Sequence, residues 1–175
     1  MKKVLVLAVA FVVLGSALAY AQTTDPIETI RQHYAAINRS APTYRKVKKD
    51  LSGFSAEGGQ LLAYFHGPTV MKIAATYFGE MGKTSEDFYY WDGKLIFVLR
   101  SEATYDKPLS GKVVKKVEDR FYFNNGKLIR WIGGDGKQMA ADSPDYGTNE
   151  TDYLKTSKQF SEGARGKGQT IESDQ

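Results

Sequence analysis

Side chains that could do acid–base or metal chemistry are few in this chain of 175 residues. It contains two histidines, His33 and His66, and no cysteine, which excludes disulfide bonds and thiol catalysis. Two histidines at this separation do not form a sequence-spaced zinc motif, and we expect neither a metal nor a cofactor. Neither a phosphate-binding glycine loop nor a nucleophile elbow is present in the sequence.

The sequence offers acid–base chemistry through paired carboxylates, which a histidine or a tyrosine could assist. His66 stands at a predicted strand end, before Gly67 and Pro68. The carboxylates that could meet it in the fold are Glu57, Glu80, Glu86 and Asp87. A small hydrolase with a site assembled across a sheet from His66 and such carboxylates is therefore one hypothesis. Acids are also common on solvated strand ends, and the sequence favours the alternative of a non-catalytic protein. A cavity that holds His66 and a carboxylate would favour the hydrolase.

The N-terminus predicts export. Lys2 and Lys3 precede an apolar run over 4–14, and Ala19-Tyr20-Ala21 has the form of an A-x-A cleavage site. We interpret 1–21 as a signal peptide that is cleaved before Gln22, in preference to an uncleaved membrane anchor. We therefore expect a periplasmic or secreted protein with no integral membrane segment after cleavage.

Charge argues against a nucleic-acid partner. The chain has 24 basic and 20 acidic residues, a formal charge of +4, and removal of Lys2 and Lys3 with the signal peptide leaves +2. The denser basic groups, at 45–49 and 112–116, are better interpreted as solvated faces than as anion sites. Removal of 21 from 175 residues leaves 154, a length that suits one domain.

The first predicted element is a helix with a clear start. Asp25 suits the N-cap, Pro26 the first helical position, and Glu28 the third position after the cap. The helix should run to about Asn38, with an apolar stripe at helical spacing made by Ile27, Ile30, Tyr34 and Ile37. His33 flanks that stripe as a boundary residue.

The segment 58–133 predicts a β-meander of about six strands. Asp92-Gly93 and Asn125-Gly126 are dipeptides typical of two-residue type I′ hairpin turns. The segment 44–51 is ambiguous between helix and strand, with strand favoured. Six strands span about 29 Å, whereas one 13-residue helix is only about 20 Å long. We therefore expect an α+β fold in which the N-terminal helix packs on a curved, mostly antiparallel sheet.

The domain boundaries follow from these elements. We expect a single α+β domain over 22–147. The segment 148–175 should contribute a helix-like stretch and then a disordered tail, because the residues after Ser161 are polar and rich in glycine.

Two hairpins repeat one pattern: "EDFYYWDGKLIFVL" at 86–99 and "EDRFYFNNGKLIRWI" at 118–132 align with one single-residue gap. Together with "SAEGGQLLAYFHG" at 55–67, these hairpins resemble an uncharacterised family of small exported bacterial proteins. The matching stretches, 55–67, 76–108 and 113–132, cover most of the chain before the tail. The resemblance implies the helix and the paired hairpins, but no activity and no catalytic residue.

Two-residue turns also predict which residues share a face of the sheet. One face should be the core, with Phe88, Tyr90, Leu95, Phe97, Leu99, Val113, Val117, Phe121, Phe123, Leu128 and Ile132. The other face should carry Tyr89, Trp91, Ile96, Val98, Tyr122, Ile129 and Trp131. This second face is too apolar for a plain solvent surface, so either the C-terminal segment covers it or a partner binds it.

Six residues of the two hairpins are the expected binding residues. Tyr89, Trp91, Tyr122, Ile129 and Trp131 would form a strip that docks an unknown envelope protein or ligand, with Arg120 stacked on Trp131 at the rim. The sequence alone thus favours an exported cell-envelope protein that acts as a non-catalytic binding or interaction module through an aromatic sheet face.

Overall fold

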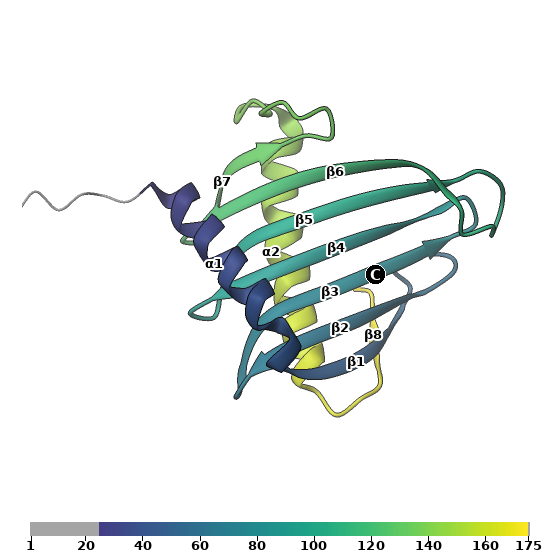
Figure 1. Ribbon diagram of the computed structural model, residues 1–175, viewed down its shortest axis with the longest axis horizontal. Helices are drawn as coiled ribbons and strands as arrows, with labels where there is room; N and C mark the ends of the chain where they lie inside the picture. The colour runs from purple at the N-terminus through teal and green to yellow at the C-terminus, as the bar shows by residue number, and fades with distance from the viewer. Residues whose placement is uncertain (1–24, 175) are drawn as a thin grey trace, which may run out of the picture.

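The computed structural model describes residues 25–174, so the predicted signal peptide and its cleavage site lie outside the described residues. Eight strands form one open sheet in the order β7-β6-β5-β4-β3-β2-β1-β8, with a helix on each face (Figure 1). The elements are α1 (Pro26–Ser40), a 3₁₀ turn (Ala41–Thr43), β1 (Arg45–Ser52), β2 (Gly59–His66), β3 (Thr69–Gly79), β4 (Gly82–Trp91), β5 (Lys94–Tyr105), β6 (Val113–Asn124), β7 (Lys127–Ile132), α2 (Pro144–Arg165) and β8 (Thr170–Glu172).

The predicted α+β fold is confirmed, with eight strands instead of six. β1 to β7 form an antiparallel meander, and the long strands β5 and β6 arc across the sheet (Figure 1). The ambiguous segment 44–51 is the strand β1, and β8 pairs with it in parallel. Among residues 25–174, neither helix is long and apolar enough to cross a membrane.

Helix α1 begins as its capping residues predict. The side chain of Asp25 accepts a hydrogen bond from the Ile27 amide at 2.9 Å, and Pro26 occupies the first turn. Ile27, Ile30 and Ile37 are buried, so the predicted apolar stripe does face the sheet.

Both hairpin turns have the predicted two-residue form. Asp92 and Gly93 have φ of 48° and 73°, and Asn125 and Gly126 have φ of 49° and 75°, as a type I′ turn requires. Just beyond each turn, however, one residue bulges out of the ladder. Tyr90 pairs with Leu95 but Tyr89 pairs with Phe97, so Ile96 is the extra residue of β5.

The second hairpin carries the same bulge at the corresponding position of the repeat. Phe123 pairs with Leu128 but Tyr122 pairs with Arg130, so Ile129 is the extra residue of β7. Each bulge moves the rest of its strand to the opposite face, because side chains alternate along a strand. The predicted register is therefore wrong beyond each bulge: Phe97, Leu99 and Ile132 join the α1 face, whereas Val98 and Trp131 join the α2 face.

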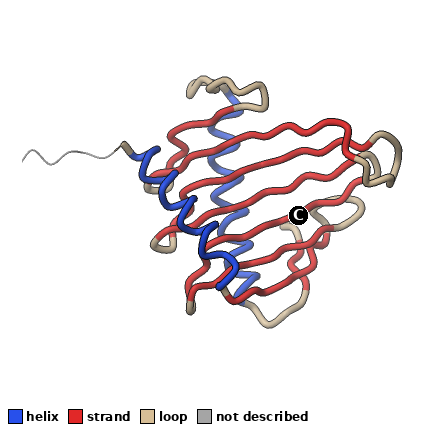
Figure 2. Tube along the Cα trace, in the orientation of Figure 1, coloured by secondary structure: helices blue, strands red, loops and turns tan. Residues whose placement is uncertain are grey.

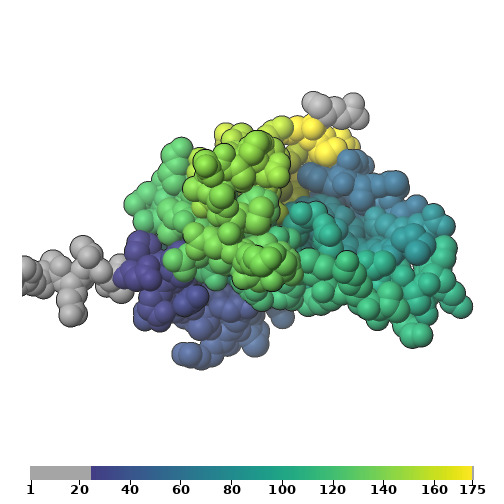
Figure 3. Space-filling view, turned by 90° about the horizontal axis from the view of Figure 1, so that it is seen from above, coloured from purple at the N-terminus to yellow at the C-terminus, as the bar shows by residue number. Residues whose placement is uncertain are grey.

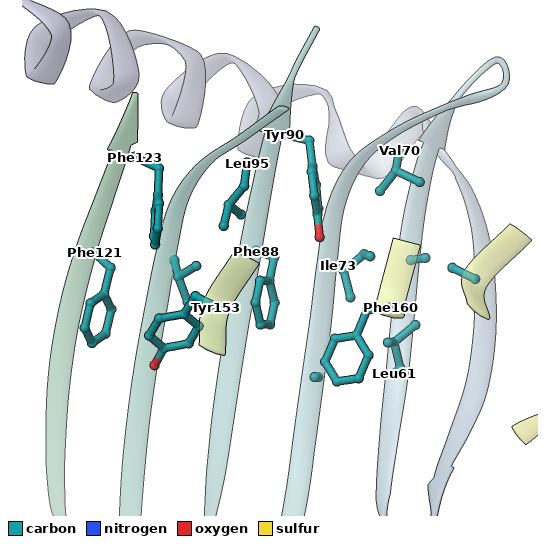
Figure 4. Packing of buried hydrophobic residues seen from close by; sticks show 14 of the residues in the cluster. Leu61, Val70, Ile73, Phe88, Tyr90, Leu95, Phe121, Phe123, Tyr153 and Phe160 are labelled. Carbon is teal, nitrogen blue, oxygen red and sulfur yellow. The ribbon is translucent and has the colours of Figure 1, made fainter. Parts of the chain in front are cut away.

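Helix α2 covers the larger core. Tyr153 and Phe160 point from α2 among Phe88, Phe121 and Leu61 of the strands (Figure 4). The predicted core residues Phe88, Tyr90, Leu95, Phe121, Phe123 and Leu128 lie in this cluster. The C-terminal helix thus packs on the predicted core face, and α1 covers the second, aromatic face.

The C-terminal segment is more ordered than the sequence predicts. α2 starts at Pro144, before the expected boundary at 148, and β8 is held by the Ser173 amide, which donates to the Ser52 carbonyl at 2.9 Å. Lys49 explains part of this order, because its buried ammonium donates to the carbonyls of Gly166 (2.8 Å) and Gly168. Lys49 is therefore not part of a solvated basic face.

Candidate functional site

The residues of the predicted binding strip do not share one surface. Tyr89 and Tyr122 lie on the α1 face and are buried, with Tyr89 only 1% exposed. Trp131 lies on the α2 face, where it stacks on Phe121 with ring centroids 5.2 Å apart and its indole N–H donates to Asp119 at 3.1 Å. Ile129, the bulged residue, is 38% exposed. The bulges separate these side chains, and the role of each in binding stays a prediction.

Trp91 and Arg120 lie on either side of α1. Trp91 stacks on His33 of the helix, with ring centroids 3.8 Å apart and planes 16° from parallel. Arg120 pairs with Ile132 across the ladder instead of Trp131, and its guanidinium donates to Glu118 at 3.0 Å. The predicted stacking of Arg120 on Trp131 is therefore wrong.

Two predicted residues, Tyr122 and Arg120, line a cavity of about 310 Å³ between α1 and strands β5 and β6. We call it the aromatic pocket; its lining is Ile30, Arg31, Tyr34, Phe97, Leu99, Glu118, Arg120 and Tyr122. Tyr34 meets the edge of Phe97 at 5.3 Å, and Phe97 packs on Tyr122 at 4.9 Å. These contacts give the pocket a floor of packed aromatic rings.

Charged groups lie around this aromatic floor. Arg31 is exposed and lies 4.0 Å from Glu28, a distance that leaves the guanidinium open to other partners. Glu118 accepts from both Lys116 (2.8 Å) and Arg120 (3.0 Å), and the hydrogen bond from Lys116 is the main cause that lowers the pKa of Glu118. The pocket itself therefore offers two guanidinium groups against one carboxylate.

A polar network fixes the end of α1 beside this site. The Tyr89 hydroxyl donates to Asn38 of α1 at 3.1 Å and accepts from the Lys72 ammonium at 3.0 Å. Lys72 also forms an ion pair with Asp87 at 2.7 Å. Burial raises the pKa of Tyr89 to about 12, so the hydroxyl keeps its proton at neutral pH. The network holds the C-terminal half of α1 on the sheet.

His66 lines a cavity together with a carboxylate, Asp92, which is not one of the four that the sequence suggests. A cavity of about 600 Å³ is lined by His66, Pro68, Thr69, Met71, Trp91, Asp92, Gly93 and Arg165. His66 and Asp92 are both exposed, and within residues 25–174 no hydrogen bond or ion pair joins them. His66 instead packs loosely on Tyr44, with centroids 5.9 Å apart.

Glu86 is a carboxyl group that contacts two tyrosines, one on the sheet and one on α2. It accepts hydrogen bonds from Tyr77 at 2.9 Å and from Tyr153 of α2 at 3.3 Å. Burial raises the pKa of Glu86, against the opposing effects of Tyr77 and the Arg100 charge. Burial also raises the pKa of both tyrosines. The sequence offered Glu86 as a candidate carboxylate, but nothing in it pairs Glu86 with a helix residue 67 positions away.

Comparisons of the sequence and the structure with known proteins found no match. No family model, no curated protein and no solved structure matches the chain.

Proposed function

We propose that the protein is an exported, non-catalytic binding module, and that its ligand is a small amphiphile with an apolar body and an anionic head. The observation that carries this proposal is the aromatic pocket, in which an apolar floor meets Arg31 and Arg120 at its edge. Tyr122 and Arg120 belong to the residues that the sequence pattern selected for binding.

The walls of the aromatic pocket favour an apolar body. Five of its lining residues, Ile30, Tyr34, Phe97, Leu99 and Tyr122, are aliphatic or aromatic. A volume of about 310 Å³ lies at the lower end of the range of small-molecule sites, roughly 300–1,000 Å³. A short alkyl chain or a single aromatic ring system suits such a volume better than a protein segment does.

The edge of the pocket favours an anion. Glu118 is already shared between Lys116 and Arg120, so it does not neutralise Arg31 as well. Guanidinium groups bind carboxylates and phosphates with two parallel hydrogen bonds. The anionic head of a ligand at this edge would therefore accept hydrogen bonds from both arginines. The apolar body of the ligand would displace water from the aromatic rings.

Export supports a role in the cell envelope, and it rests on the N-terminal pattern and on the resemblance to exported bacterial proteins. Intact mass spectrometry of the protein from the secreted or periplasmic fraction should show a chain that begins at Gln22. A mature chain that retains 4–14 would contradict export by a cleaved signal peptide.

The binding proposal is tested with a matched pair of probes, decanoate and decanol, which share a chain and differ in charge. Calorimetry should show that the protein binds decanoate more tightly than decanol. Arg120→Gln should weaken the binding of decanoate by roughly tenfold and leave the binding of decanol nearly unchanged. Arg39→Gln, at an exposed arginine in the last turn of α1 that does not line the aromatic pocket, is the control. Equal affinity for the two probes would contradict an anion site at Arg120. So would an equal loss of affinity for decanoate in Arg120→Gln and Arg39→Gln.

A small hydrolase remains the second candidate, because the cavity of about 600 Å³ combines His66 with Asp92. A nitrophenyl ester tests it. Turnover above the buffer rate that is lost in His66→Ala would support the hydrolase and count against a purely binding role. Turnover that survives this substitution would not come from His66.

A further inference from the structure

A third cavity lies at the end of the sheet that neither helix covers. There the strands run out into loops alone (Figure 2), and the teal atoms from the middle of the chain extend past the purple atoms of α1 and the green atoms of α2 (Figure 3). The cavity has a volume of about 630 Å³. We call it the polar cavity; it lies against Phe54, Tyr77 and Glu86 and reaches Arg100 and Glu102.

Phe54 places the polar cavity on the α2 side of the sheet. It packs on Phe160 of α2 at 5.3 Å and on Tyr77 of β3 at 6.1 Å. The polar cavity is therefore separated by the whole sheet from the aromatic pocket, which lies beside α1. The two cavities share no lining residue.

The charges that line the polar cavity balance. Its carboxylates are Glu86 and Glu102, and its cations are Arg100 and Lys83, of which Lys83 reaches the cavity from the α1 face of β4. Arg100 is paired with Glu102, which it contacts directly. The lining residues thus carry two nominal charges of each sign, in contrast to the aromatic pocket, where two arginines meet one glutamate.

The side chains of Glu86 and Arg100 in this cavity are held in place by hydrogen bonds to other residues. Tyr77 donates to one carboxylate oxygen of Glu86 and Tyr153 to the other, and each oxygen keeps a further lone pair. Arg100 and the threonine hydroxyls of Thr84 and Thr104 supply donors on the neighbouring wall. The cavity thus presents fixed acceptors and donors side by side.

Apolar surface lies at the rim of the same cavity. Phe78 is 38% exposed and Met81 is 49% exposed, and both line it. We propose that the polar cavity is a second binding site and that its ligand is a neutral carbohydrate. A sugar ring carries adjacent hydroxyls, which donate and accept, together with an apolar face of C–H groups, and it has no net charge. That combination matches the walls, the charge balance and the rim.

The test uses three neutral trisaccharides, maltotriose, cellotriose and triacetylchitotriose, in an NMR titration of the protein. At least one should shift the amides of Tyr77, Phe78 and Lys83 at concentrations up to about 10 mM, where a millimolar site is filled. Glu102→Gln and Met81→Ala should each weaken that binding by about fivefold or more. Glu118→Gln, in the aromatic pocket, should leave it unchanged, and decanoate should not compete.

Several outcomes would overturn this inference. One is the absence of shifts at these amides with all three sugars. Another is a sugar response that survives both Glu102→Gln and Met81→Ala in folded protein. A third is tighter binding of trigalacturonate or spermidine, which would show a site for a charged ligand. Because decanoate reports on the aromatic pocket alone, failure of the sugar site is distinguishable from failure of the proposed function.

Discussion

Trp131 of β7 stacks on Phe121 of β6 with ring planes 25° apart, so both rings belong to the core beneath α2. Phe121 also packs on Tyr153 of that helix at 4.6 Å. The pair therefore joins the second hairpin to the C-terminal helix.

The burial of Phe121 predicts a large loss of stability on truncation. Phe121→Ala should lower the free energy of unfolding by about 3–5 kcal/mol, because the ring is fully buried and its removal leaves a cavity. Val114→Ala, on the same strand but 59% exposed, should change it by less than about 0.5 kcal/mol. Urea denaturation measures both. Similar losses in the two variants would contradict the assignment of Phe121 to the core face of β6.

Two glycines of α2 should respond in opposite directions to alanine. A Cβ at Gly163 would lie 2.6 Å from Ile171 of β8, whereas one at Gly147 would meet nothing within 4 Å. Gly163→Ala should therefore cost about 1–3 kcal/mol of stability through overpacking. Gly147→Ala should add up to about 1 kcal/mol through helix propensity. If Gly163→Ala also stabilises the protein, Ile171 of β8 does not pack closely on α2.

Lys49 should anchor β8, whereas its neighbour Lys48 should not. Lys49→Met leaves the carbonyls of Gly166 and Gly168 without their buried charged donor, and we expect a loss of about 2–4 kcal/mol. Lys48→Met, exposed on the same strand, should be nearly neutral. Amide exchange supplies the local readout: Ser173 should exchange faster in Lys49→Met alone. Unchanged protection there would contradict the anchoring role.

The raised pKa of Glu86 predicts a pH dependence of stability. The folded chain holds the proton of this carboxyl more tightly than the unfolded chain does, whose ordinary value is 4.5. Between that value and the higher folded pKa the folded state binds more protons, so this contribution to stability falls as pH rises through the interval. Glu86→Gln should remove that decline. A variant that keeps the same slope in thermal melts from pH 4 upward would show that another group causes it.

The elements of this fold were predictable because their signals are local. A cap and a proline start α1, and two glycine-containing dipeptides set the hairpin turns. The bulges at Ile96 and Ile129 were not predictable, since Leu and Ile follow the lysine in both hairpins and either could face inward. One inserted residue then reversed the faces of Val98 and Trp131.

The sites depend on contacts that the sequence does not carry. Tyr122 and Arg120 were correctly expected on the aromatic side, but the pocket they line exists only because α1 covers part of that face. Glu86 meets Tyr153 only because α2 crosses the sheet above β4. Side chains far apart in sequence are brought together by packing, for which a single sequence gives no spacing rule.

The most direct test of the binding proposal is an NMR measurement of where decanoate lies on the protein. Intermolecular NOEs should join the methylene protons of decanoate to the rings of Tyr34, Phe97 and Tyr122, which line the aromatic pocket. NOEs confined to other residues, such as Trp91 or Phe78, or binding with no NOE to these three rings, would contradict the account.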